Sequence, residues 1–179
     1  ILGIAGLMGS GRSTIAKSIF GLNKRADGQI ILNGTEVKMK SPAEAIRHRI
    51  GFLPEDRRLL GLFMQLSIRE NISIANLKQF SRFGVVNQKS ENLLVDGQFN
   101  TVSIKAPSAR SVVSTLSGGN QQKVVLARWL AANCDILIFD EPTRGIDIGS
   151  KEEIYQLINE FVKGGGSVIV VSSEMPELM

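Results

Sequence analysis

The chain has 179 residues, of which 43% are hydrophobic and 21% charged, and its formal net charge is +4. This composition is typical of one globular domain with a buried core, and the scattered charge predicts a solvated exterior, so we expect no nucleic-acid partner. The single cysteine and single histidine exclude a disulfide framework and a Cys/His zinc cluster. No apolar run approaches the roughly 20 residues of a membrane helix, so we expect no direct membrane insertion.

The N-terminal residues predict a phosphate-binding loop between a strand and a helix. ILGIAG is a short apolar run that predicts a buried parallel strand, and STIAKSIFG predicts a helix. Between them, GLMGSGRST matches the pattern G-x-x-x-x-G-K-[ST] at Gly6, Gly11 and Ser13, but Arg12 stands at the lysine position. A helix N-terminus here offers N–H groups and a positive dipole end to an anion. For this motif alone, a glycine-rich turn without a ligand remains the alternative.

The next part of the chain predicts small elements and then becomes irregular. GQIILNGTEV predicts a hairpin at its NG pair. Ser41 and Glu44 predict a helix that begins with a capping box, with proline at its first position. IGFLPED predicts a strand over residues 50–53 that ends at the proline. From about residue 55 to 115 the sequence is polar and irregular, with short helical pieces such as SIRENISIANL.

The stretch TLSGGNQQKVVLARWLAANCDILIFDEPTRGID carries the strongest signal. Ser117 can cap a helix that starts at the glycines, with an apolar face formed by Val124, Val125, Ala127, Leu130 and Ala131. Residues 135–139, DILIF, predict a central parallel strand. Asp140 and Glu141 follow at its carboxyl end, where open α/β sheets place their ligands. This placement suits a Mg²⁺-coordinating carboxylate followed by a general base; two acids that begin a turn are the alternative.

The C-terminal part predicts one more helix and one more strand. Ser150 and Glu153 predict another capping box. An apolar stripe typical of core packing follows at Ile154, Leu157, Ile158 and Phe161. Three glycines end this helix, and residues 167–173, SVIVVSS, predict a buried strand. The alternation of helices and strands predicts an α/β fold with a mostly parallel sheet.

At LSGGNQQK followed by ILIFDEPTRGID, the chain resembles the ATP-binding subunits of ABC transporters. Residues 116–121 are similar to their signature motif, 135–141 to their Walker B strand and 145–147 to their D-loop. More narrowly, GGNQQK, the arginine of the P-loop, FLPEDR and SSEMPEL resemble the second, C-terminal cassette of the tandem ATPases that power importers for ribose, galactose, xylose or arabinose.

The resemblance implies a P-loop NTPase fold. Its RecA-like core would comprise residues 1–54 and 123–179, and an inserted α-helical subdomain over 55–122 would end in the signature motif. We expect the cassette to be truncated at both ends. The implied function is an ABC-type ATPase that couples ATP hydrolysis to monosaccharide import through a partner permease, located peripherally on the cytoplasmic face of the cell membrane.

The resemblance also assigns roles to individual residues. In this family two cassettes face head to tail, and each ATP lies between the P-loop of one and the signature motif of the other. Glu141 would be the catalytic residue, and Ser13 and Asp140 would hold Mg²⁺. The contacts to the chain's own ATP would come from Gly6, Gly9, Ser10, Gly11, Arg12, Ser13 and Thr14. The contacts to the companion's ATP would come from Ser117, Gly118, Gly119 and Gln121.

Three departures from the family pattern concern the chain's own site. Glu55 stands where such cassettes carry glutamine near the γ-phosphate, which adds like-charge repulsion unless the acid is protonated or Mg²⁺ offsets it. Ser173 stands where a switch histidine normally follows the last strand. The guanidinium of Arg12 is bulkier than an ammonium. These departures predict a weakened P-loop half beside a complete signature half.

Two rival hypotheses remain. The first is a regulatory module that binds ATP and hydrolyses almost none, which the three departures favour and the intact Glu141 disfavours. The second is an ABC-type ATPase outside transport, acting in DNA repair or on the ribosome. For that class we expect a long coiled-coil insertion or a basic interdomain arm, and the sequence shows neither.

Overall fold

The computed structural model describes residues 1–7, 9–23 and 28–177. Met8 of the glycine loop and Leu178 of the SSEMPEL motif lie outside the described residues. The central sheet has four parallel strands in the order β1-β8-β7-β4. They are β1 (Leu2–Ala5), β4 (Ile50–Leu53), β7 (Ile136–Asp140) and β8 (Ser167–Ser172). The predicted α/β fold with a parallel sheet is therefore confirmed.

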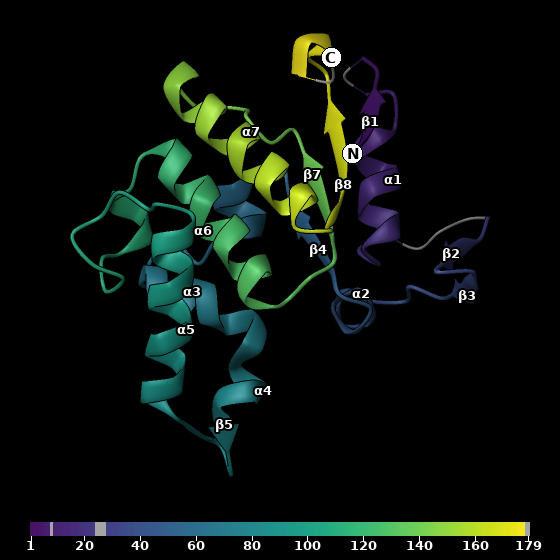
Figure 1. The fold of residues 1–179 in the computed structure, drawn as a ribbon. Coiled ribbons are helices and arrows are strands. Elements are labelled where there is room, and N and C mark those ends of the chain that lie inside the picture. The colour runs from purple at the N-terminus through teal and green to yellow at the C-terminus, as the bar shows by residue number, and fades with distance from the viewer. Residues whose placement is uncertain (8, 24–27, 178–179) are drawn as a thin grey trace.

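Helices cover both faces of this sheet. Figure 1 shows α1 (Arg12–Ile19) on one side and α6 (Gly118–Ala131) and α7 (Ile148–Lys163) on the other. β4 and the residues after Ile136 in β7 are buried, which explains why these strands are continuous apolar runs rather than alternating ones. Because the strands are parallel, their carboxyl ends meet at one edge of the sheet.

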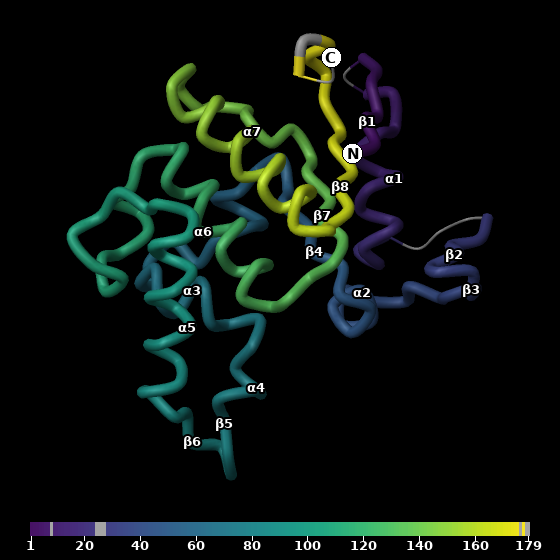
Figure 2. Tube along the Cα trace, in the orientation of Figure 1, coloured from purple at the N-terminus to yellow at the C-terminus, as the bar shows by residue number. Residues whose placement is uncertain are grey.

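A second group of helices lies beside the sheet. It contains α3 (Ile68–Ser73), α4 (Leu77–Phe80) and α5 (Gln88–Thr101), with the hairpin of β5 (Ser81–Arg82) and β6 (Val85–Val86) at its tip (Figure 2). α6 packs on α3 and α5 and also on α7 and β4, so it joins this group to the sheet. The sequence did not predict α5 as a helix, since only Glu91 and Val95 of it are buried and its apolar spacing is weak.

The remaining elements are short. The hairpin predicted at the NG pair is confirmed as β2 (Ile30–Leu32) and β3 (Thr35–Val37), which form a separate two-stranded sheet. α2 is Pro42–Arg47, and a π-helical turn, η1, is Arg57–Gly61. The 3₁₀ turns are η2 (Ile74–Asn76), η3 (Val113–Thr115) and η4 (Met175–Glu177). Within the described part of the chain, no helix has both the length and the hydropathy to span a bilayer.

The capping box predicted at the start of α2 is wrong. Ser41 is the N-cap residue, but its side chain makes no capping hydrogen bond. Glu44 instead accepts a hydrogen bond from the backbone N–H of Lys40 at 2.6 Å. The helix still begins where the sequence predicted, because its proline at the first turn fixes φ without needing a cap.

The capping box predicted for α7 is also wrong. Asp147 is the N-cap and accepts from the N–H of Ser150 at 3.0 Å. A charged acceptor three positions earlier thus moves the helix start upstream of Ser150. The carboxylate of Glu153 forms ion pairs with Lys105 at 2.8 Å and Lys123 at 2.7 Å instead of capping. The predicted capping of α6 by Ser117 is confirmed, with Asn120 N–H as donor.

Candidate functional site

The candidate site lies at the carboxyl edge of the parallel sheet. The glycine loop follows β1, Glu55 follows β4, Glu141 follows β7 and Ser173 follows β8. These residues are distant in sequence, and the common direction of the four strands brings them together. The edge where open α/β sheets bind ligands therefore carries the predicted site residues.

A cavity of ≈ 180 Å³ opens at the glycine loop. Its lining consists of Gly9, Ser10, Gly11, Arg12, Ser13, Thr14, Glu55 and Glu141. Gly9 and Gly11 have left-handed φ values of 84° and 89°, and a Cβ atom on either would meet no atom within 4 Å. Glycine is therefore required by the backbone, and the space in front of it is open to a phosphate. Gly6 is not part of the lining; it supports the loop near Ser10.

Ser13 and Asp140 form a pair suited to a divalent cation. Ser13 Oγ donates to Asp140 Oδ1 at 2.8 Å. Asp140 Oδ2 is buried and has no hydrogen-bond partner among the described residues. Burial raises the pKa of Asp140, while the hydrogen bond from Ser13 opposes that rise. Carboxylate and hydroxyl oxygens are ligands that Mg²⁺ uses, so the free oxygen fits this ion.

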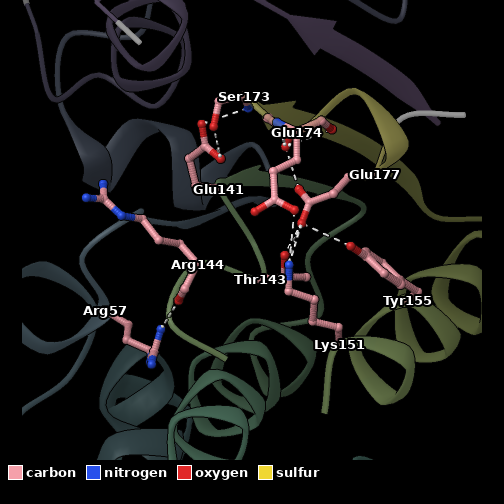
Figure 3. A network of polar contacts seen from close by, with 10 residues as sticks. Arg57, Glu141, Thr143, Arg144, Lys151, Tyr155, Ser173, Glu174 and Glu177 are labelled. Atoms are coloured by element: carbon pink, nitrogen blue, oxygen red, sulfur yellow. Dashed lines mark hydrogen bonds and ion pairs between the residues drawn. The ribbon is translucent and has the colours of Figure 1, made fainter. Parts of the chain in front are cut away.

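Arg12 and Ser173 both hold the carboxylate of Glu141. Arg12 Nη2 lies 3.2 Å from Glu141 Oε1. The backbone N–H of Ser173 donates to the same oxygen at 2.9 Å, and Ser173 Oγ donates to Oε2 at 3.1 Å (Figure 3). Both oxygens of the predicted catalytic carboxylate thus have partners. Glu141 also has φ 51°, a conformation that is costly for a non-glycine residue and common at functional sites.

The Arg12 side chain has capacity for one more acceptor. It is only 7% exposed, and its Nη1 is buried without a hydrogen-bond partner among the described residues. A buried guanidinium nitrogen without an acceptor is unfavourable. Because Arg12 lines the glycine-loop cavity, this nitrogen suits an anion that enters there.

Glu55 lies at the cavity in an ion pair with Arg144. The sequence left two ways to offset its charge, protonation or Mg²⁺, and the structure shows a third, a neighbouring guanidinium. Sequence reasoning missed Arg144, for which the only signal was a basic residue in EPTRGID. The carboxylate therefore adds less repulsion toward a phosphate than its charge alone would suggest.

The signature residues divide into an exposed and a buried part. Ser117 is exposed at the N-terminus of α6. Gly119 is buried, and a Cβ atom there would lie 2.4 Å from Cβ of Ser150, so glycine is required by packing. Gln121 is 0% exposed, and its amide donates to the carbonyl of Leu116 at 3.1 Å. The structure thus places Gln121 in the interior as a support for the loop and not at the surface where a nucleotide could touch it.

Glu177 forms a network that sequence reasoning missed. It accepts hydrogen bonds from Thr143 and from Tyr155 Oη, the latter at 3.0 Å (Figure 3). It also accepts a hydrogen bond from Ser172 Oγ at 2.5 Å. Burial, together with the nearby carboxylate, raises the pKa of Tyr155 to about 12. The network ties the segment after β8 to the loop after β7, and so fixes the position of Ser173 against Glu141.

The comparisons with known proteins agree with this geometry. The family model described as ABC transporter matches residues 1–144. The chain is 49% identical over 179 residues to the ribose import ATP-binding protein RbsA of Bacillus cereus, and 47% identical over 180 residues to the xylose import ATP-binding protein XylG of Thermoanaerobacter pseudethanolicus. In each case the match covers 100% of this chain and 36% of the relative, so the chain spans about a third of their length.

The fold is similar to that of solved cassettes. A dimeric structure of a post-hydrolysis state of the ATP-binding cassette MJ0796 bound to ADP and Pi superposes with a TM-score of 0.80 at 27% identity, over 98% of this chain and 75% of that one. A nucleotide-free cassette from an ABC transporter superposes with a TM-score of 0.76. The chain therefore belongs to the ABC transporter family and is an ATP-binding cassette of the ABC ATPase type.

Proposed function

We propose that the chain is the ATP-binding and ATP-hydrolysing part of a monosaccharide importer. Two relatives that match its whole length are named for ribose and xylose import, which supports a sugar as the transported substrate. As a cassette attached to a permease, it would lie peripherally on the cytoplasmic face of the membrane. Because the chain spans 36% of these relatives, sugar import is a proposal about the protein that contains it.

The P-loop cavity is the proposed site for the chain's own ATP. Gly9, Ser10, Gly11, Arg12 and Thr14 would face the phosphates, and Ser13 and Asp140 would hold Mg²⁺. When bound, the ion would neutralise charge on the phosphates. Glu141 would orient or deprotonate the attacking water, which requires a free carboxylate oxygen.

We infer from the contacts of Glu141 with Arg12 and Ser173 that the P-loop site of this chain binds and hydrolyses ATP weakly. A phosphate that binds the free Nη1 of Arg12 must compete for this guanidinium with the carboxylate of Glu141, which already holds Nη2 in a pair whose side chains are 7% and 11% exposed. A water must in addition displace Ser173 from an oxygen that it holds at 2.9 or 3.1 Å. Each exchange reduces the free energy that binding and hydrolysis can use.

The signature half is proposed to serve a companion cassette. Ser117 is exposed at the N-terminus of α6, and its hydroxyl and this positive end of the helix would suit the γ-phosphate of a second ATP. The solved neighbour described as a dimer bound to ADP and Pi supports pairing of two cassettes. We also propose that residues 55–122 form the helical subdomain and that 1–54 and 123–179 form the core.

An exposed apolar patch supports attachment to a permease. Leu59, Leu60 and Phe63 are 81%, 64% and 52% exposed, and they follow directly after the segment of Glu55. Adjacent exposed apolar side chains of this size are typical of an interaction surface. We assign the patch to a cytoplasmic segment of the permease, since the proposed importer needs such a contact. Changing Leu59 and Leu60 to serine would release the full-length protein from membranes that contain the permease, and retention at the wild-type level would contradict the assignment.

The experiment uses the full-length protein with its permease and a sugar-binding protein in vesicles. Uptake of labelled ribose, xylose, galactose and arabinose is measured with and without ATP. Photolabelling by an azido-ATP, followed by proteolytic separation of the cassettes, shows which of them binds nucleotide. ATP-dependent uptake of one of these sugars is expected, and hydrolysis with no uptake of any of them would contradict the proposal.

A purely regulatory role for the own site is the second candidate, favoured by the occupied oxygens of Glu141. In that case the cassette would hold ATP without turnover. Trapping with vanadate separates the two readings, because trapped ADP forms only after hydrolysis. Vanadate-trapped label in this cassette supports slow hydrolysis, whereas ATP label without trapped ADP supports the regulatory role.

A further inference from the structure

Arg57 lies where three functional segments meet. It is the first residue of η1, just after Glu55 in the chain. Its Nη1 donates to the carbonyl of Arg144 at 2.8 Å (Figure 3). Its Nη2 donates to the carbonyl of Gly145 at 3.1 Å. One guanidinium therefore donates hydrogen bonds to two successive carbonyls of the loop that follows Glu141.

The same guanidinium reaches the start of the signature helix. A Cβ atom on Gly118 would lie 2.6 Å from Arg57 Nη2 and 2.8 Å from the carbonyl oxygen of Gly145. Contacts this short exclude any larger residue unless the segments separate. Only glycine fits at position 118, because Arg57 and the carbonyl of Gly145 lie too close for a side chain. We call the packed group of Arg57, Gly118 and Gly145 the junction.

Arg57 is an unfavourable residue to bury, which is consistent with a role of this junction in positioning the loops. Arg57 is 9% exposed, and its Nε has no hydrogen-bond partner among the described residues. Both acceptors of its Nη atoms are backbone carbonyls, which carry no formal charge. Burial lowers the pKa of Arg57, which reflects that cost. An apolar side chain would be cheaper to bury, but only a planar fork can span two adjacent carbonyls.

The junction is connected to the P-loop cavity through Glu55. Glu55 lines that cavity and pairs with Arg144, whose carbonyl is an acceptor for Arg57. A phosphate that enters beside Glu55 changes the charge that this carboxylate faces, and a shift of Arg144 moves the carbonyls held by Arg57. Such a displacement would reach Gly118, because the guanidinium lies so close to it that a Cβ there would be 2.6 Å from Arg57 Nη2.

We propose that Arg57 is a positioning residue that sets the signature loop, residues 117–119, relative to the loop at 144–147 and couples it to the state of the P-loop cavity. The inference rests on the proposed function, in which the signature loop completes the ATP site of the companion cassette. Arg57 itself touches no nucleotide in this scheme. Its effect falls on turnover in the companion site, with the chain's own pocket left intact.

The test compares Arg57→Lys and Arg57→Met with Arg82→Met in the full-length protein assembled with its permease. Arg82 is a matched control that also loses one positive charge; its guanidinium contacts Phe83 at the distant hairpin. Lysine keeps the charge but has no fork. For both Arg57 variants we expect kcat for ATP to fall about 10- to 100-fold, the cost typical of a small misplacement of reacting groups. KM and photolabelling of both cassettes should change little.

A chemical rescue separates positioning from general destabilisation. In Arg57→Ala, added methylguanidinium should restore part of kcat, while methylammonium should not, because only the former presents the fork. Thermal unfolding of each variant checks the fold. Gly118→Ala keeps the arginine but would displace its guanidinium, since the new Cβ would lie 2.6 Å from Arg57 Nη2, and it should reproduce the loss of kcat. An unchanged kcat in Arg57→Met, or loss of labelling at the own P-loop in parallel with kcat, would overturn the proposal. Sugar uptake by the wild type in the same vesicles tests the proposed function separately.

Discussion

The P-loop half and the signature half of this cassette differ in what their functional groups already contact. In the P-loop half, Arg12, Ser173 and Glu141 bind one another. In the signature half, the exposed Ser117 caps its own helix and keeps its face toward solvent. In the P-loop half, both oxygens of the Glu141 carboxylate are already paired within the chain, whereas the signature half has an uncharged hydroxyl exposed to solvent.

This difference shows how one chain can carry a weak and a strong contribution to catalysis. Charged groups that are paired internally must break those contacts before they can bind a ligand, whereas preorganised N–H dipoles at a helix start need no rearrangement. We therefore propose that the departures Arg12 and Ser173 would weaken the chain's own site and leave its contribution to the proposed companion site unaffected. Three variants can break or sharpen this comparison, and a fourth tests stability at a place away from both halves.

The largest effect is expected for Ser117→Asp in the full-length protein. Aspartate is as good an N-cap as serine, so α6 should remain folded. Its charge would face the γ-phosphate of the companion's ATP, and we expect total hydrolysis to fall by about 100-fold or more. Ser117→Asn is the matched control, since it keeps the cap without the charge and should retain most activity. Equal activity of the aspartate and asparagine variants would show that the signature half does not contribute to the ATP site of the companion cassette.

Arg12→Lys should strengthen nucleotide binding at the chain's own pocket. The ammonium is compact, fits the usual phosphate cradle and holds Glu141 less firmly than the fork does. We expect the Kd for Mg-ATP at this pocket to fall about fivefold, or ~1 kcal/mol, measured by photolabelling of the separated cassettes. A weaker affinity would show instead that Arg12 is the better phosphate ligand in this loop.

Ser67→Ala tests stability at a place remote from both halves. Ser67 and Glu70 form the capping box of α3, and its loss should lower the free energy of unfolding by about 1 kcal/mol. The hydrogen bonds from Ser67 lower the pKa of Glu70 from 4.5, so this contribution is complete above that value and is lost as pH falls through the folded pKa. Chemical denaturation at pH 7 and pH 3 should therefore show a smaller difference at pH 3. A difference independent of pH would mean that the ionised Glu70 contributes nothing.

Glu141→Gln should have the smallest effect on catalysis. If the own site hydrolyses little ATP, removing its base should change total hydrolysis by less than about twofold. Steady phosphate release by the full-length protein measures this, with the corresponding change in the companion cassette as the control that should abolish activity. A large loss of total ATP hydrolysis from Glu141→Gln alone would show that the P-loop half of this chain is the main site of hydrolysis.

Local sequence patterns were sufficient where a short segment decides its own structure. Apolar runs predicted the strands β1, β4, β7 and β8, and the glycine loop and the signature loop were found by their spacing. The prediction that β1 is buried was wrong, because this strand lies at the edge of the sheet and three of its four residues are exposed. The patterns failed where a neighbour offered a better partner. Asp147 displaced Ser150 as the cap of α7, and Lys40 took the carboxylate of Glu44. α5 was missed because burial of two residues leaves almost no periodic signal.

The sequence by itself determined the family, the parallel sheet and the residues of both loops, since these follow from backbone rules and from motifs that are contiguous in the chain. Only the tertiary structure decided which charges meet. The contact between Ser173 and Glu141 joins residues 32 positions apart, and that between Arg57 and Arg144 joins residues 87 positions apart. Ion pairs and hydrogen bonds depend on distances of a few ångströms, and spacing along the chain carries no information about those distances until the strands have set the edge on which the side chains converge.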